Sequence, residues 1–398
     1  MTVEAGTPTP RVSIWVTADR PETRLGTRLA FLVAGFGVAS WAPLVPFVKE
    51  RLQVDDGVLG LLLLCLGVGS IAAMLLTGVL SARYGSRPII LAGGFGLAVL
   101  LPSLVVAGSP LSLGLMLFAF GAALGSLDVA MNIHGVEVER AARQPLMSGF
   151  HALFSVGGFA GATVMTFLLS SRIAPLASTL FASVLMAIAM TLAAPRLLRA
   201  SHSEKTPLIV APHGIVLLLA TLAFVMFLVE GAILDWSALL ASGKGLVSEA
   251  RGGLGYSMFA IAMTVGRLSG DFVTARVGDR AVLFWGGLAT MAGFALVLSA
   301  PIASLAMSGF LLIGLGASNI VPVLFRGAGA QRAMPAGLAV AAITTAGYAG
   351  VLVGPAAIGL VAKSAGLPVA FWLLAALVSA VVFSARTVTG FANLKGVG

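Results

Sequence analysis

The stretch that decides the fold reads Leu80-Ser81-Ala82-Arg83-Tyr84-Gly85-Ser86-Arg87, because its pattern returns at Val273-Thr274-Ala275-Arg276-Val277-Gly278-Asp279-Arg280. Each copy has an apolar residue, a hydroxyl residue, Ala-Arg, one variable position, Gly, a second variable position and Arg. Each copy also joins two long apolar runs. The copies lie about half a chain apart, and an internal repeat of this kind divides a chain into two similar halves.

The composition is that of a membrane protein. Hydrophobic residues make up 59% of the 398 residues and charged residues only 10%, whereas soluble domains carry about 25% charged residues. Apolar runs long enough to cross about 30 Å of hydrocarbon recur along the chain. The net charge of +9 comes without a basic cluster interleaved with aromatic residues, so it indicates membrane topology and no nucleic-acid partner. The single cysteine, Cys65, excludes a disulfide framework and a thiolate metal site.

Charged or Gly/Pro-containing breaks divide the apolar sequence into twelve predicted spans, six on each side of a polar linker. The spans are apolar on nearly all sides, as helices that face lipid and protein must be. The predicted spans are 28–48, 57–81, 88–108, 110–137, 148–172, 174–196, 212–241, 251–274, 281–300, 302–325, 335–362 and 367–388.

These spans define the predicted organisation of the chain. Six plus six helices in a parallel repeat are a known transporter architecture. We predict an all-α membrane protein that consists of a cytoplasmic tail (1–27), an N-terminal six-helix bundle (28–196), a cytoplasmic linker (197–211), a C-terminal six-helix bundle (212–388) and a second cytoplasmic tail (389–398).

The distribution of Lys and Arg predicts the orientation. Placing the N-terminus in the cytoplasm puts 17 of the 24 Lys and Arg residues in cytoplasmic segments, six outside, and Arg267 within a span. This bias agrees with the positive-inside rule. We therefore predict a multi-pass protein of the bacterial inner or plasma membrane with both termini in the cytoplasm.

We call the two stretches 78–87 and 273–280 the hinge. The repeat extends beyond it. Trp41-Ala42-Pro43-Leu44 has an echo in Trp236-Ser237-Ala238-Leu239, and Gly158-Phe159-Ala160-Gly161 in Gly347-Tyr348-Ala349-Gly350. The offsets lie between 189 and 195 residues, so the register is kept across half of the chain.

The hinge from Gly78 to Arg87 resembles the signature between the second and third helices of the major facilitator superfamily. The resemblance covers about 28–388 and implies the major facilitator fold, with twelve transmembrane helices in two six-helix pseudo-repeat bundles. It implies a transporter that works by alternating access, without a cofactor, and not an enzyme. The family has an aspartate where this chain has Ala82 and Ala275, and that acid helps to lock the cytoplasmic side of the outward-facing state.

Because both acids are absent, the basic residues of the hinge must find other partners. Helix C-termini, linker acids such as Glu204 and anionic lipid headgroups are the alternatives. The residues that we assign to the hinge and to gating are Gly78, Arg83, Gly85, Arg87, Arg276, Gly278 and Arg280.

The fourth span carries the strongest candidate for coupling chemistry. Leu127-Asp128-Val129-Ala130-Met131-Asn132 resembles the fucose-permease-like branch of the superfamily, in which an acid and an asparagine lie four residues apart in one helix. In those sugar–proton symporters the acid is implicated in coupling, which implies that role for Asp128. Asp128 and Asn132 also share one helix face. A buried carboxyl group favours its protonated form, so Asp128 is a candidate proton site; structural hydrogen bonding between helices is the alternative.

Glu230 and Asp235 lie on the seventh span, five residues apart. Five residues turn a helix by about 140°, so both line one cavity only if the cavity is wide or the helix unwinds near Gly231. Glu230, near mid-depth, is a candidate for coupling or for a hydrogen bond to the substrate, and a structural pair between helices is the alternative. Asp235 lies nearer the outer end.

Four further residues are weaker candidates. His151 titrates near neutrality and suits a proton relay, although a lone histidine at a helix end is more often an interfacial residue. Trp41 and Trp236 occupy matched positions and suit stacking on a flat substrate, but an aromatic belt at the membrane surface explains them equally well. Asn319, with Pro322, predicts a slightly broken tenth helix beside the cavity.

Arg267 and Asp271 lie four residues apart on the eighth span. Residues at this spacing face each other on a helix, so we predict that the two charges neutralise one another, with gating as a secondary role.

The function that these patterns indicate is secondary active transport by a monomer in the lipid bilayer. The solute is small and polar, sugar-like by resemblance, and moves together with protons. Proton-antiport efflux of amphiphilic compounds is the alternative, followed by a non-transporting membrane sensor or scaffold.

Overall fold

A computed structural model describes residues 20–54, 56–199, 211–243, 245 and 254–393. Residues 1–19, 200–210 and 394–398, which hold most of the predicted tails and linker, lie outside the described residues, as does the candidate hinge partner Glu204.

The described chain is helical and contains no strand. Its elements are α2 (Pro21–Trp41), η1 (Ala42–Leu44), α3 (Val45–Leu52), α4 (Asp56–Tyr84), α5 (Ser86–Val106), α6 (Pro110–Ala142), α7 (Met147–Ser170), α8 (Pro175–Ala193), η2 (Ala194–Arg196), α9 (Ile215–Gly243), α10 (Leu254–Ser299), α11 (Ala303–Ala317), α12 (Ile320–Ala330), α13 (Ala336–Ala365) and α14 (Leu367–Asn393).

The two glycines of the hinge adopt the same unusual backbone conformation. Gly85, between α4 and α5, has φ 79° and ψ 161°, and Gly278, inside α10, has φ 80° and ψ 159°. This region of φ and ψ is open essentially to glycine alone. The repeated hinge is therefore a structural repeat, in which one glycine reverses the chain between two antiparallel helices.

Gly278 also explains the number of spans. In the described chain, 11 helical stretches are long and apolar enough to cross a membrane. The longest, α10, consists of two helices, 254–277 and 279–299, that meet at Gly278. The protein thus has the twelve predicted transmembrane helices.

The tenth span is broken, as Asn319 and Pro322 predicted. Its first part, α11, ends at Ala317, and its second part, α12, begins at Ile320. Proline has no N–H group, and its ring clashes with the carbonyl group of the residue four positions earlier, here Ser318. The break accordingly lies at Ser318 and Asn319.

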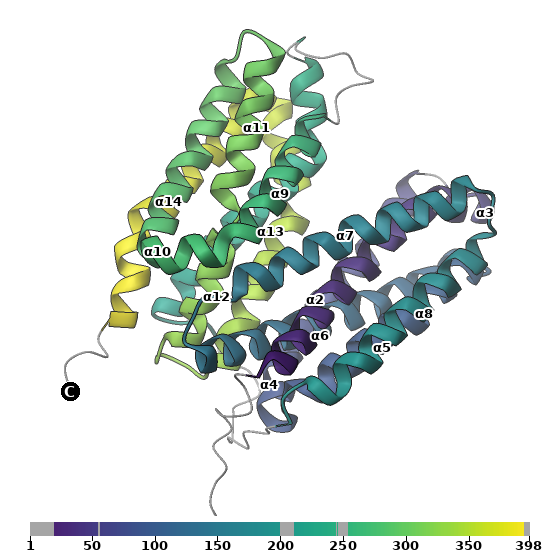
Figure 1. Ribbon diagram of the computed structural model, residues 1–398. Helices are drawn as coiled ribbons and strands as arrows, with labels where there is room; N and C mark the ends of the chain where they lie inside the picture. Colours follow the sequence, from purple (N-terminus) through teal and green to yellow (C-terminus); the bar gives the residue numbers. More distant parts are fainter. Residues whose placement is uncertain (1–19, 55, 200–210, 244, 246–253, 394–398) are drawn as a thin grey trace, which may run out of the picture.

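The helices form two bundles, α2–α8 and α9–α14, that diverge toward one end of the molecule (Figure 1). At the other end α7 contacts α10, α4 contacts α13, and α6 contacts α12 and α13. The described chain begins and finishes at that second end. We call it the closed end and the opposite one the open end.

The glycine hinge makes a direct prediction about stability. A Cβ atom at Gly278 would have no heavy atom within 4 Å, so Gly278→Ala tests backbone strain alone. We expect it to lower the free energy of unfolding by about 1–3 kcal/mol, measured as a lower thermal midpoint of the purified protein in detergent. Gly390→Ala is the matched control, because Gly390 is helical and equally uncrowded. Equal midpoints for the two variants would contradict the prediction.

Candidate functional site

Asp128 lies near the middle of α6 and connects the two bundles. Asn132, one turn later, donates from Nδ2 to Oδ1 of Asp128 at 3.0 Å and to the Asp128 carbonyl oxygen at 2.9 Å. The Asp128 side chain also interacts with Tyr348, on α13 of the other bundle. Asp128 and Asn132 are both buried. A carboxyl group deep in the membrane is thus held by one partner from each bundle.

Arg267 forms a second connection between the bundles at mid-membrane. Its Nη1 donates to Oγ of Ser155, on α7, at 2.9 Å. Its Nη2 lies 3.7 Å from Oε2 of Glu230, on α9. That distance is an ion-pair contact and too long for an N–H···O hydrogen bond. Glu230 and Tyr348 also interact electrostatically, so the Asp128 and Arg267 groups are neighbours.

The predicted pairing of Arg267 with Asp271 along one helix is wrong. Oδ1 of Asp271 accepts a hydrogen bond from the Ser148 amide at 3.0 Å, and its Oδ2 accepts one from the Gly149 amide at 2.8 Å. The first N–H groups of a helix have no partner within the helix. Those of α7 therefore attract Asp271 across the interface, while Arg267 is left to Glu230 and Ser155.

His151 lies in an aromatic stack that joins the bundles. Its ring centroid is 5.2 Å from that of Phe31 on α2 and 5.5 Å from that of Phe325 on α12. Aromatic rings from both bundles cover it, so its side chain is buried between the bundles. In the described part of the chain its Nε2 has no hydrogen-bond partner. The proton relay stays a prediction.

Of the remaining candidates, Asp235 is the one near the Arg267 group, because Asp235, Glu230 and Arg267 all interact electrostatically with Tyr256. Trp41, only 5% exposed, is packed at the end of α2, whereas the Trp236 ring lies against Gly359 of α13. Asp235 is exposed, and α9 is continuous, so it does not unwind near Gly231. Asn319 donates from Nδ2 to the Gly266 carbonyl oxygen at 2.9 Å and thereby fastens the break before α12 to α10.

Two carboxylates share the start of α7 at the closed end. Oε2 of Glu139, near the end of α6, accepts hydrogen bonds from the amides of Leu146 and Met147 at 2.6 and 2.8 Å. Asp271, from the other bundle, accepts hydrogen bonds from the next two amides, those of Ser148 and Gly149. The four N–H groups at the start of α7 that have no partner within the helix are therefore all bound by a carboxylate. Negative charge at a helix N-terminus is further stabilised by the helix dipole.

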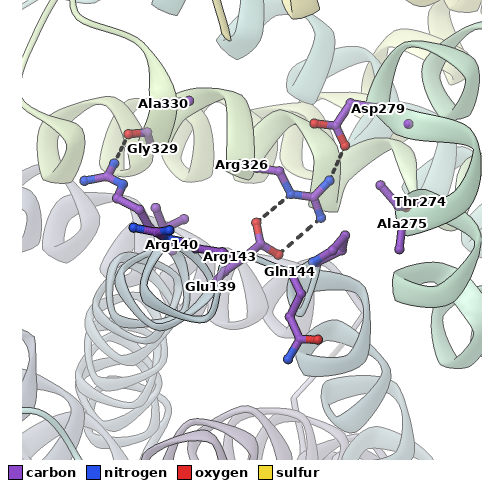
Figure 2. A pocket seen from close by; sticks show the side chains of 13 residues that line it. Glu139, Arg140, Arg143, Gln144, Thr274, Ala275, Asp279, Arg326, Gly329 and Ala330 are labelled. Atoms are coloured by element: carbon purple, nitrogen blue, oxygen red, sulfur yellow. Dashed lines mark hydrogen bonds and ion pairs between the residues drawn. The ribbon is translucent and has the colours of Figure 1, made fainter. Parts of the chain in front are cut away.

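Arg326 of α12 joins this site to the hinge (Figure 2). Its Nε donates to Oε1 of Glu139 at 2.6 Å, and its Nη1 donates to Oδ1 of Asp279, directly after Gly278. Arg140 on α6 donates to the Gly329 carbonyl oxygen of α12. These residues line a cavity of about 420 Å³ between the bundles. We call Glu139, Asp271, Asp279 and Arg326, together with the four amides of α7, the closed-end lock.

Comparison with known proteins agrees with this architecture. The family model described as Major Facilitator Superfamily matches residues 28–332. The chain belongs to the major facilitator superfamily. An uncharacterized MFS-type transporter of Yersinia pestis is 49% identical over 367 residues, which cover 92% of this chain and 96% of the relative.

Solved structures of the superfamily share the fold. The human organic anion transporter MFSD10 superposes with a TM-score of 0.76 at 16% identity, over 92% of this chain and all of that one. The Escherichia coli fucose:proton symporter FucP superposes with a TM-score of 0.73 at 16% identity, over 92% of this chain and 98% of that one. A structure of FucP in the outward conformation superposes with a TM-score of 0.73 at 14% identity, over 94% of this chain and 99% of that one.

The superfamily's hinge acid is replaced differently in the two halves. On α10, Asp271 lies one turn before Ala275 and makes the contact with α7 described above. On α4, Gly78 faces α13 so closely that a Cβ atom would lie 2.8 Å from Cβ of Ala341. The first contact is therefore polar, and the second consists of small residues packed together.

The hinge arginines have partners near the closed end. Arg87 donates from Nε to the carbonyl oxygen of Ala194, the C-cap of α8, at 3.0 Å, so one predicted kind of partner, a helix C-terminus, is confirmed. The Arg83 guanidinium lies 5.2 Å from the Tyr84 ring centroid, and that of Arg276 lies 4.1 Å from the Phe272 ring centroid. Arg280 is exposed.

Sequence reasoning missed Glu139, Arg326 and Tyr348. A signal for Glu139 was present, because it continues the spacing of four and three residues that runs through Asp128, Asn132 and Gly135. Arg326 and Tyr348 carried no such signal, since Arg326 directly follows the predicted tenth span and Tyr348 is the one tyrosine of the predicted eleventh. Their importance comes from partners in the opposite bundle.

The lock predicts that one added methyl group, at Gly149, breaks the Asp271 contact. A Cβ atom at Gly149 would lie 2.6 Å from Oδ2 of Asp271, so Gly149→Ala must break that contact. Losing one hydrogen bond to a charged group costs about 1.5 kcal/mol, which raises the population of the opened closed end about tenfold.

The measurement is maleimide labelling of Thr274→Cys in a Cys65→Ser background. Thr274 is 4% exposed beside the lock, and Cys65 is the only native cysteine. Gly158→Ala is the control on the same helix, because a Cβ atom there meets its nearest neighbour at 3.8 Å. Equal labelling rates in the two alanine variants would refute the role of the Asp271 contact.

Proposed function

We propose that this protein is a proton-coupled secondary transporter that moves a small polar, sugar-like solute together with protons by alternating access. The observation that carries the proposal is the Asp128 carboxyl group, which is buried near the middle of α6, is hydrogen-bonded to Asn132 in its own bundle and interacts with Tyr348 in the other. FucP, which shares the fold, is a fucose:proton symporter.

The chemistry of this contact supplies a coupling mechanism. An ionised carboxylate accepts hydrogen bonds that are roughly twice as strong as those of a neutral acid. Proton binding to Asp128 therefore weakens the Tyr348 contact between the bundles, and proton release strengthens it. The proton thus acts on the equilibrium between the two arrangements of the bundles, because it has a different affinity for each.

The bundles 28–196 and 212–388 are the two units that we propose to move against each other in a monomer. The closed end faces the cytoplasm of a cell with this protein in its inner or plasma membrane, because the positive-inside bias puts both termini there. The conformation described is then outward-facing, in agreement with the likeness to FucP in its outward conformation. Opening toward the cytoplasm requires the closed-end lock to separate.

Proton-antiport export of amphiphilic compounds is the second candidate. It is favoured by an apolar groove of about 560 Å³ between α4, α9 and α13, lined by residues such as Leu75, Phe224 and Leu338. The hydroxyl group of Thr345, which also lines the groove, has no hydrogen-bond partner in the described chain. Accumulation driven by an inward proton gradient indicates symport, whereas accumulation only in inverted vesicles indicates export.

Asp128 predicts a pH dependence that can be measured before the solute is known. We expect labelling of Thr274→Cys, in the Cys65→Ser background, to become faster as the pH falls when it is divided at each pH by the rate with a free thiol, because protonation weakens the contact between the bundles. Asp128→Asn should remove most of this dependence, since an amide does not titrate. Glu50→Gln, a change of an exposed carboxyl group on α3, should leave it intact. Identical pH profiles for wild type and Asp128→Asn would exclude Asp128 as the proton site.

A further inference from the structure

The contact between Glu230 and Arg267 is incomplete. The carboxylate stops 3.7 Å short of the guanidinium, outside hydrogen-bond range. Within the described chain the Nε of Arg267 has no hydrogen-bond partner. Buried charges are normally paired and hydrogen-bonded. Because the Glu230 carboxylate is not hydrogen-bonded to Arg267, it can accept hydrogen bonds from a third group.

The exposed member of the pair is the acid. The Arg267 side chain is 8% exposed and that of Glu230 is 38% exposed. Arg267 is also turned toward Ser155, on the opposite bundle. A solute that arrives between the bundles therefore meets the carboxylate first, with the guanidinium behind it.

Two tyrosines lie within electrostatic range of the same carboxylate. Phe227 precedes Glu230 by three residues on α9, and its ring centroid lies 6.3 Å from that of Tyr348. Tyr256 of α10 and Tyr348 both interact electrostatically with Glu230. The faces of aromatic rings attract cations, and carboxylates do so more strongly. Together they form a surrounding suited to an ammonium group.

The net charge of the groups around Glu230 also favours a cationic solute. Asp128, Glu230 and Asp235 are three carboxyl groups against the single guanidinium of Arg267, and Tyr256 interacts with three of these four groups. The cluster has a formal charge of −2 when every group is ionised. A proton on Asp128 leaves −1, and a singly charged cation brings the loaded cluster to neutrality. A neutral or anionic solute would leave uncompensated negative charge at mid-membrane, which is unfavourable.

We propose that Glu230 binds a protonated amine of the solute, with Arg267 as its positioning residue and Tyr256, Tyr348 and Phe227 around the ammonium group. The solute is then a small polar amine, for example an amino sugar. This inference rests on the proposed transport function and narrows its substrate class.

A local charge measurement tests the site without knowledge of the solute. Leu234, one turn after Glu230 on α9, is 51% exposed. In a Leu234→Cys, Cys65→Ser protein, we compare the labelling rates of a trimethylammonium and a sulfonate methanethiosulfonate, each divided by its rate with a free thiol. We expect the cationic reagent to be favoured. Glu230→Gln should lower this preference at least about threefold, because a charge one turn away is only partly screened.

Glu50→Gln is the matched control, since it makes the same change outside the region between the bundles. A preference for the sulfonate reagent, or a preference that Glu230→Gln leaves unchanged, overturns the assignment. The readout does not involve proton coupling. If Asp128→Asn keeps the pH dependence described above while the cation preference holds, the proposed coupling fails and the cation site stands.

A ligand panel gives the second measurement. Thermal midpoints are recorded with tyramine, tyrosol and 4-hydroxyphenylacetate, and with glucosamine, N-acetylglucosamine and glucuronate, so that each series differs mainly in charge. We expect only an amine to raise the midpoint, and the shift to disappear in Glu230→Gln. A larger shift with a neutral or acidic member, or no shift with either amine, contradicts the proposal.

Discussion

The start of α7 is the point on which the closed arrangement of the two bundles depends. The four N–H groups at this start that have no partner within the helix donate in pairs, two to Glu139 from the same bundle and two to Asp271 from the other. Buried N–H groups without partners are costly, so separating the bundles requires water or another acceptor to replace Asp271. Arg326 holds Glu139 and Asp279 at the same time. The lock is therefore one network of hydrogen bonds, in which each bond strengthens its neighbours.

The contact between α7 and α10 links this network to the middle of the membrane. Asp271 binds the first turn of α7, and Arg267, one turn earlier on α10, binds Ser155 further along α7. Between these contacts the His151 ring is stacked on Phe325 of the other bundle and meets Phe31 of its own bundle edge-to-face. The Arg267 group and the Asp271 contact therefore lie on one interface between the same two helices.

The two halves share a backbone plan and differ in chemistry. Gly85 and Gly278 have the same dihedral angles, and the pairs α7–α10 and α4–α13 are equivalent contacts across the repeat. One pair is held by carboxylate–amide hydrogen bonds, whereas the other brings Gly78 against Ala341. A charged contact needs specific geometry, and a contact of small residues tolerates sliding. Of the two equivalent helix pairs, α7–α10 is therefore the polar one and α4–α13 the apolar one.

The sequence by itself determined the membrane class, the twelve spans, the repeat and the glycine hinge, since these follow from composition, local periodicity and the conformations open to glycine. It also singled out Asp128 and Asn132, because four residues along a helix place two side chains on one face. Tertiary structure alone decided that Tyr348 meets Asp128, that Arg326 meets Glu139, and that Arg267 turns to Glu230 and Ser155 instead of Asp271. Each of these pairs joins different helices, and the choice among several polar partners depends on which helices pack together. A spacing along one helix cannot contain that information.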